Sequence, residues 1–369
     1  MINHKDFKEV SVYGRYVASK MLEEKWLSKL EESTINVVGE SVNKKPIKSI
    51  SVGEGSLKIL MWSQMHGNES TTTKAVLDLV NFLHSGIETA NAILENCSLL
   101  IVPILNPDGA ENYTRVNANA VDLNRDAKER TQPESKILRK LFNEFQPNFC
   151  FNLHDQRTLF SAGEHAKPAT VSFLSPSSDV SRKLTPSRET AMKLIVAMNQ
   201  KLQEQIAGQV GRYDDGFNDN CVGDSFQMSG VPTILFEAGH YPNDYEREQT
   251  RSYIFQALVE GVKTISEDAI ENYSTEDYFK IPENQKLFYD ILIRNAHKIN
   301  SELEDATNIG IRYKEILENG IINFVPEIAD IGNMEGHFGH QNLDCSDEED
   351  LNRLKNHKEV MDLILDVRK

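Results

Sequence analysis

The sequence predicts an α/β protein with a mixed, largely parallel central sheet flanked by helices, followed by a small β-rich C-terminal domain. Over residues 40–270, short apolar runs typical of strands alternate with segments of helical periodicity. Residues 98–104 (SLLIVPI) are continuously apolar, as expected of a strand covered on both faces. After about residue 275, short β-prone runs between polar turns replace this alternation. These observations predict a large sheet domain and a smaller appended one.

The expected elements follow from this pattern in chain order. Apolar positions at helical spacing predict one or two helices within residues 6–33. Strands are expected at residues 47–52, 57–62, 98–104, 149–153 and 233–236. Helices are expected at residues 71–83, 133–145, 190–207 and 251–270. The later β-prone runs are residues 287–293, 309–313 and 321–325, before an acidic helical tail at 346–369. We therefore expect a catalytic domain over residues 1–272 and a C-terminal domain over 273–369.

The composition restricts the classes of partner. A formal net charge of −16 argues against nucleic acid or an anionic membrane as the main partner, because phosphate binding needs clustered positive charge. No run approaches the roughly 20 apolar residues of a spanning helix, and the N-terminus lacks the apolar core of a signal peptide. A cytoplasmic protein with four reduced, unpaired cysteines is the expectation. The sequence leaves the oligomeric state open.

Polar side chains follow three of the expected buried strands. His66 and Glu69 come shortly after residues 57–62, His154 directly follows the run 149–153, and Glu237 directly follows the run 233–236. The carboxyl ends of parallel strands meet at one edge of a sheet, so these side chains are expected to gather there. Imidazole and carboxylate groups suit zinc. For each alone, a solvated or structural side chain is the alternative, and a buried Glu237 needs a partner, either a zinc-activated water or an arginine.

Two arginines lie downstream of the turn sequence NPDG at residues 106–109. Arg115 and the pair Asn124-Arg125 could present fork-shaped donors to a carboxylate or to a developing oxyanion. The alternative is that both arginines are surface partners for the many acidic residues.

Together these motifs resemble one family of enzymes. The order HxxE, NPDG, Arg, DLNR, His and Glu is similar to that of the zinc metallocarboxypeptidases, whose wider clan includes succinylglutamate desuccinylase and aspartoacylase. The resemblance covers about residues 50–265. It implies a carboxypeptidase-like sheet fold and one zinc ion per chain.

The resemblance also implies a role for each matching residue. The zinc ligands would be His66, Glu69 and His154. Arg115 would polarise the scissile carbonyl, and Glu237 would be the general base and later the general acid. Asn124 and Arg125 would bind the terminal carboxylate of the substrate.

The match departs from the family pattern at several positions. Ala120 stands where a Gly is usual in bacterial members, and Asp126 stands where an Asn is usual and could alter the charge preference of the carboxylate clamp. Tyr213 lies near the place of the mobile substrate-binding Tyr of digestive enzymes, with a structural turn as the alternative. Asp224 lies where such enzymes line the side-chain pocket, with a capping or exposed Asp as the alternative.

These observations predict a zinc-dependent hydrolase that cleaves a peptide or peptide-like amide bond next to a free carboxylate. The alternative enzyme is a zinc N-acyl amino acid deacylase acting on a small acyl-amino-acid substrate, because the sequence FEAG around Glu237 leans towards the desuccinylase side of the clan. A non-catalytic binding protein on this scaffold is a third hypothesis. The spacing of His337 and His340 could in principle hold a metal, but a polar loop is the preferred interpretation.

Overall fold

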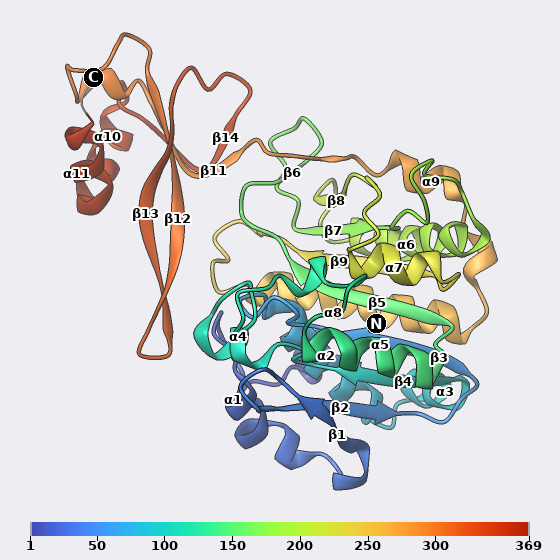
Figure 1. Cartoon of the computed structure of the whole chain (residues 1–369). Coiled ribbons are helices and arrows are strands. Elements are labelled where there is room, and N and C mark those ends of the chain that lie inside the picture. Colours follow the sequence, from blue (N-terminus) through green and yellow to red (C-terminus); the bar gives the residue numbers. More distant parts are fainter. Residues whose placement is uncertain (1, 368–369) are drawn as a thin grey trace. The chain divides into compact units, whose positions relative to one another are not determined.

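The computed structural model describes residues 2–367 and divides into two compact units (Figure 1). Unit 1 comprises residues 1–156 and 169–284, and unit 2 comprises residues 157–168 and 285–369. This division differs from the boundary expected between residues 272 and 273. Helix α9 (Thr275–Lys280) belongs to unit 1, because Tyr278 is buried there and its hydroxyl accepts a hydrogen bond from the Ser175 N–H at 3.2 Å.

Unit 1 is built on an eight-stranded sheet with the order β1-β2-β4-β3-β5-β9-β7-β8. Its four central strands are parallel, β1 and β2 are antiparallel at one end, and β7 runs antiparallel to β9 near the other. The bounds in chain order are β1 Ile35–Glu40, β2 Pro46–Val52, β3 Leu57–Trp62, β4 Cys97–Val102, β5 Phe149–Asp155, β7 Val171–Leu174, β8 Val210–Arg212 and β9 Thr233–Ala238. The expected mixed, largely parallel sheet is therefore confirmed.

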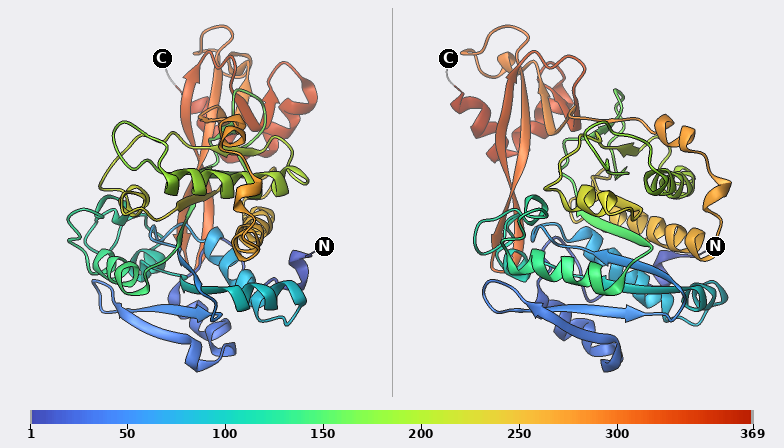
Figure 2. Two further views of the ribbon diagram at one scale, coloured as in Figure 1. Left: turned by 90° about the vertical axis from the view of Figure 1, so that its right-hand side faces the viewer. Right: turned by 45° about the vertical axis from the view of Figure 1, so that its right-hand side comes forward.

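Helices cover both faces of this sheet (Figure 2). Helices α2, α6 and α8 share one hydrophobic core with Phe151 and Leu153 of β5, whereas α5 and α7 share a second core with Leu60 and Trp62 of β3. This two-sided covering explains why the central strands are almost uniformly apolar. The helix bounds are α1 Ser19–Lys25, α2 Thr71–Leu83, α3 Glu88–Asn96, α4 Pro107–Asn112, α5 Pro133–Phe145, α6 Pro186–Gln203, α7 Val222–Met228 and α8 Glu248–Ser266.

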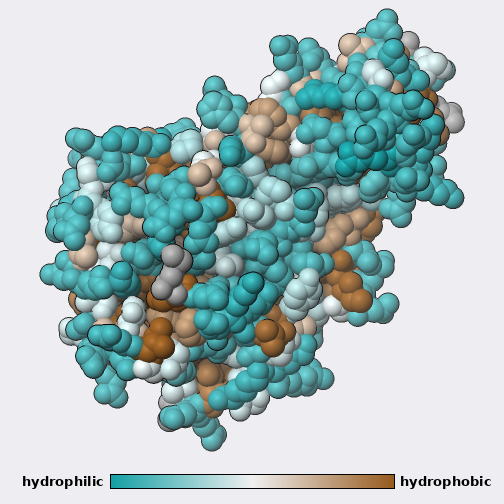
Figure 3. Space-filling model, turned by 180° about the vertical axis from the view of Figure 1, so that it is seen from behind, coloured by the Kyte–Doolittle hydropathy of each residue, from teal (hydrophilic) through white to brown (hydrophobic). Residues whose placement is uncertain are grey.

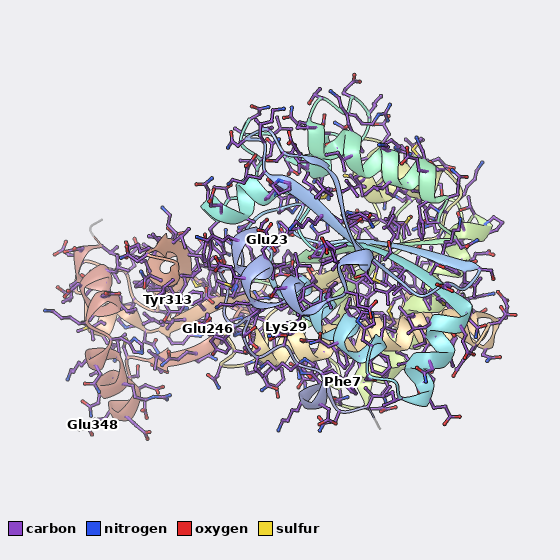
Figure 4. The ribbon with its side chains drawn as sticks, turned by 90° about the horizontal axis from the view of Figure 1, so that it is seen from below. Phe7, Glu23, Lys29, Glu246, Tyr313 and Glu348 are labelled. Atoms are coloured by element: carbon purple, nitrogen blue, oxygen red, sulfur yellow. The ribbon has the colours of Figure 1, made fainter. Side chains whose placement is uncertain are left out.

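The N-terminal segment differs from the expected helices over residues 6–33. Only α1 is an α-helix there, and the remaining residues form turns, bends, irregular chain and short 3-10 helices. Figure 4 labels Phe7 and Lys29 of this segment. Phe7 packs edge-on against Phe82 at 5.3 Å between ring centroids. The buried Asp78 accepts from Arg251 at 2.6 Å and lies 2.7 Å from the His4 ring. These buried contacts override the helical spacing of the apolar residues.

Unit 2 contains a four-stranded sheet with the order β13-β12-β11-β14, which confirms the expected β-rich C-terminal part. The bounds are β11 Phe288–Arg294, β12 Asn308–Glu318, β13 Ile321–Gly332 and β14 Phe338–Asp344, followed by α10 Glu348–Asn356 and α11 Lys358–Asp366. Residues 368–369 of the expected helical tail lie outside the described residues. His340 lies in β14 rather than in a polar loop, because this segment pairs in parallel with β11, and the His340 ring stacks on Phe288 at 4.5 Å.

Hydrophilic residues dominate the face of the molecule seen from behind, with separate hydrophobic patches between them (Figure 3). Within residues 2–367, none of the helices combines the length and the apolar character that a membrane-spanning segment needs.

The short strands β6 (Ser161–Ala162) and β10 (Asn284–Gln285) form a separate two-stranded sheet.

Candidate metal centre

Three side chains expected at the sheet edge come together in one buried cluster. His66 and Glu69 lie in the turn between β3 and α2, and His154 lies near the end of β5. The Glu69 carboxylate is 2.8 Å from the Nδ1 atom of each histidine, and the two Nδ1 atoms are 3.2 Å apart. One potential ligand atom from each residue lies within 4.8 Å of the others. Two imidazole nitrogens and a carboxylate oxygen in one buried place are a donor set that fits zinc.

The turn that carries His66 and Glu69 is held by close backbone packing and by neighbouring side chains. A Cβ atom added to Gly67 would lie 1.9 Å from the carbonyl carbon of Gly109, so only glycine lets the turn approach the NPDG segment. The Asn106 side-chain N–H donates to the Met65 carbonyl at 3.1 Å. The NPDG segment is thus a turn itself and also packs against the turn that carries His66 and Glu69.

Charges within the cluster oppose the cost of burial. Burial alone would raise the pKa of Glu69, but the neighbouring His66 and His154 lower it well below its usual range. Burial would lower the pKa of His66, but Glu69 and Asp122 outweigh burial and raise it. Burial prevails at His154 and lowers its pKa, despite the charge of Glu69. The cluster therefore keeps a carboxylate ionised beside two imidazoles of different basicity.

Asp122 is a residue of this site that the sequence motifs did not identify. Its Oδ1 atom lies 3.0 Å from His66 Nε2, on the opposite side of the ring from Glu69. Its Oδ2 atom accepts from Arg115 Nε and Nη2, each at 3.0 Å. Asp122 therefore orients both a candidate metal ligand and the candidate oxyanion-stabilising arginine. In the sequence, Asp122 is marked only as the first residue of the DLNR motif, and no helical or strand periodicity distinguishes it from other aspartates.

Arg115 reaches the cluster from a more exposed position. Its Nη1 atom lies 3.3 Å from Glu69 Oε1, while about half of the side chain, 48%, stays exposed. The guanidinium is thus oriented by two carboxylates and is still accessible to a ligand.

Glu237 lies beside the cluster on the next strand. In β9 it pairs with His154 of β5 in the parallel register. Its Oε2 atom is buried and has no hydrogen-bond partner within residues 2–367. Burial, together with the charges of Glu69 and Asp155, raises the pKa of Glu237 well above its usual range. A half-buried carboxyl group with an unsatisfied oxygen is suited to exchanging a proton with a bound molecule.

The expected carboxylate clamp lies one turn beyond Asp122. The Asn124 side-chain oxygen accepts from the Val222 N–H at 3.0 Å, and the exposed Arg125 donates to the Asn124 carbonyl at 2.7 Å. Asp126, which the sequence suggested could alter this clamp, is buried and accepts from the N–H groups of Thr131 and Gln132. Its carboxylate therefore fixes the backbone at residues 131–132, before α5.

Tyr213 and Asp224 are the two remaining candidates. Burial, together with the charges of Glu237 and Glu69, raises the pKa of Tyr213, and its hydroxyl donates to the side chain of Gln156 at 2.7 Å. Asp224 lies in the first turn of α7, is buried, and accepts weakly from the Asn218 N–H at 3.4 Å. Burial raises the pKa of Asp224 to about 6.

Comparison with known proteins identifies the family of this chain. The sequence model of the zinc carboxypeptidase family matches residues 23–279, and the chain belongs to this family. Carboxypeptidase 2 of the fungus Trichophyton equinum is 28% identical over 141 residues, which cover 36% of this chain and 26% of that protein. The chain thus spans about a quarter of the length of this curated relative.

Solved structures share the fold. Carboxypeptidase A from Helicoverpa armigera has a TM-score of 0.54 at 16% identity, covering 70% of this chain and 74% of that one. A metallo-carboxypeptidase from Burkholderia cenocepacia has a TM-score of 0.50 at 18% identity, covering 63% and 65%. These similarities concern the fold alone and confirm the expected carboxypeptidase-like sheet.

Proposed function

We propose that the chain is a zinc-dependent hydrolase that cleaves a peptide or peptide-like amide bond next to a free carboxylate. The observation that carries this proposal is the buried cluster of His66, Glu69 and His154 beside the unsatisfied carboxyl group of Glu237. Catalytic zinc takes three protein ligands and keeps one position open, and this chain offers one such set among residues 2–367. We expect one zinc ion per chain.

The chemistry divides between the ion and the protein. Zinc held by the three ligands would lower the pKa of a water molecule towards about 7 and polarise a carbonyl group. Glu237, whose Oε2 atom has no partner within residues 2–367, would accept the proton of that water and would then protonate the leaving amine. Arg115, oriented by Asp122, would stabilise the negative charge that develops on the carbonyl oxygen.

Substrate recognition follows from the positive groups next to the cluster. We expect Asn124 and Arg125 to bind the free carboxylate of the substrate, because no carboxylate within residues 2–367 pairs with the Arg125 guanidinium at salt-bridge distance. We expect Tyr213 to contact the substrate and Asp224 to line its side-chain pocket. The predicted cytoplasmic location stays a prediction.

The test is the Glu237→Gln protein. This substitution keeps the shape of the side chain but removes the base, so turnover should fall by at least about a hundredfold while zinc binding is retained. Turnover within threefold of the wild-type value would contradict the assignment of Glu237.

A substrate panel separates the two hydrolase classes. Short peptides with a free C-terminal carboxylate are compared with their C-terminal amides and with N-acyl amino acids. The proposal predicts cleavage of the free peptides and little cleavage of the amides. Preferential cleavage of N-acyl amino acids would favour the deacylase alternative.

A further inference from the structure

Gln156 lies two residues after His154, and its role is not accounted for by the proposed chemistry. The side chain is buried, at 5% exposure, and makes four hydrogen bonds within unit 1. Its Nε2 atom donates to the Ala169 carbonyl at 2.6 Å and to the Ser172 hydroxyl at 3.1 Å. Its Oε1 atom accepts from the Tyr213 hydroxyl at 2.7 Å and from Asn284 Nδ2 at 3.2 Å. The amide is therefore fully satisfied.

These partners fix which end of the amide faces Tyr213. The Ala169 carbonyl can only accept, so the end of Gln156 that lies 2.6 Å from it must be the nitrogen. The other end is then the oxygen, which can only accept. The Tyr213 hydroxyl must therefore donate its proton to Gln156.

The backbone around Gln156 is shaped to hold this arrangement. Gly239 follows β9 in the sequence FEAG, and a Cβ atom there would lie 2.4 Å from Gln156 Nε2 and 1.9 Å from the Ala169 oxygen. The absence of a side chain at residue 239 thus makes room for the contact between the amide and the carbonyl. Gly239, part of the FEAG sequence that is similar to the deacylase members of the clan, is thus required in this chain by close packing.

Tyr213 is anchored at both ends by these contacts. Its backbone N–H donates to the Phe173 carbonyl at 3.0 Å, and its hydroxyl donates to Gln156. Phe173 lies in β7, which pairs with β9 next to Glu237. Gln156 directly follows β5, and its backbone N–H donates to the carbonyl of Ala238, the residue after Glu237, at 2.9 Å. The Tyr213 hydroxyl is therefore held beside the ends of the two strands that carry His154 and Glu237.

We propose that Gln156 is a positioning residue whose amide holds the Tyr213 hydroxyl at the metal site before any substrate binds. The tyrosine is then in place in the ligand-free protein, and its proton is committed to Gln156. The consequence for catalysis rests on the hydrolase function proposed above, whereas the position of Tyr213 does not.

The first experiment tests the position of Tyr213 without using activity. Wild-type protein and the Gln156→Met variant are treated with N-acetylimidazole, and acetylation of Tyr213 is followed by peptide mass spectrometry. Loss of the hydrogen bond should make Tyr213 react about tenfold faster in the variant. Equal rates in the two proteins would overturn the proposal.

The buried Tyr278 reports on folding in the same digest. If Tyr278 also becomes reactive in Gln156→Met, the variant has lost its fold. The Gln156→Asn protein then replaces it, because that side chain keeps the amide but is one methylene too short to reach Tyr213. Slow acetylation of Tyr213 in a folded Gln156→Asn protein would equally overturn the proposal.

The second experiment asks whether Gln156 acts through Tyr213. Once a hydrolysed substrate is known, KM and kcat are measured for Gln156→Met, Tyr213→Phe and the double variant. If Gln156 acts by holding the hydroxyl, the double variant should have the KM of Tyr213→Phe alone. Independent, multiplying effects would overturn the proposal.

A matched control removes a different buried hydrogen bond from unit 1. In Ser175→Ala the hydroxyl no longer donates to the Arg188 carbonyl, a bond of 3.2 Å, and KM should stay unchanged. If no substrate is hydrolysed, the proposed function fails, and the acetylation experiment still decides the position of Tyr213.

Discussion

Replacement of Asp122 by Ala should weaken zinc binding although Asp122 is not itself a candidate ligand. The carboxylate lies 3.0 Å from His66 Nε2, which fixes the orientation of the ring so that Nδ1 faces Glu69 and His154. Partners on the far side of a metal-binding histidine typically hold its tautomer and raise its basicity. Without the Asp122 carboxylate, His66 should therefore be less well oriented and less basic.

The size of the effect follows from the hydrogen bond between Asp122 and His66. A hydrogen bond to a charged group contributes about 1.5–3 kcal/mol, which corresponds to roughly 10- to 150-fold in affinity. Removing such partners from metal-binding histidines typically costs about 10–100-fold in metal affinity. We expect a decrease in this range for Asp122→Ala and a smaller one for Asp122→Asn, whose amide oxygen can still accept from His66.

The assay is competition for zinc between the protein and a chelating dye at pH 7.5. Asp219→Asn is a matched control, because it removes an exposed aspartate that pairs with Lys128 at 2.8 Å, and its zinc affinity should stay at the wild-type value. A zinc affinity of Asp122→Ala within twofold of the wild-type value would refute the role given to Asp122.

Three further predictions follow from the site. Glu69 and Asp122 raise the pKa of His66, so this histidine takes up a proton already above pH 6.5 as the pH is lowered. Zinc must then displace that proton, and the zinc affinity measured by dye competition should decrease as the pH falls. A pH-independent affinity between pH 8 and pH 6 would contradict this. Burial raises the pKa of Asp224 to about 6 in the folded protein, above its value in the unfolded chain. Ionisation of Asp224 therefore lowers the free energy of unfolding progressively as the pH rises between these two pKa values, and the whole loss is present above pH 6. Asp224→Asn should therefore stabilise the protein against denaturant by up to about 3 kcal/mol at pH 8. The gain should shrink towards pH 5, and a constant gain would argue against the raised pKa. Gly67→Ala places a Cβ atom against the backbone of Gly109, so the free energy of unfolding should fall by about 1–3 kcal/mol and the zinc affinity should decrease. An unchanged melting temperature would show that the turn can relax and would contradict this prediction.

The central part of the fold could be predicted because burial on both faces leaves a clear record in the sequence. Residues 57–62 and 149–153 are almost wholly apolar, and both lie in central strands of the sheet. The strands near the ends of the sheet were missed for the opposite reason. β1 is half-exposed, and β7 and β8 are four and three residues long, so neither alternation nor a long apolar run identifies them.

The site was predicted to the extent that it depends on strand ends. The sequence predicted that His154 and Glu237 share one sheet edge, and the structure adds that their strands are neighbours and that the two residues are paired. Asp122 and Gln156 lie outside that pattern, because the contacts of Asp122 with His66 and of Gln156 with Tyr213 join residues that are 56 and 57 positions apart. The Asp126 carboxylate binds the N–H groups of Thr131 and Gln132, and this contact depends on the local path of the loop, which the sequence pattern does not predict.

The central claim is that His66, Glu69 and His154 hold a catalytic zinc ion. The most direct measurement is zinc titration of the metal-free protein, with binding and hydrolysis of a free C-terminal peptide followed together. Both signals should saturate at one zinc per chain, and His154→Ala should lose both. Hydrolysis that is complete without zinc and indifferent to a chelator would contradict the claim, as would a protein that binds no zinc.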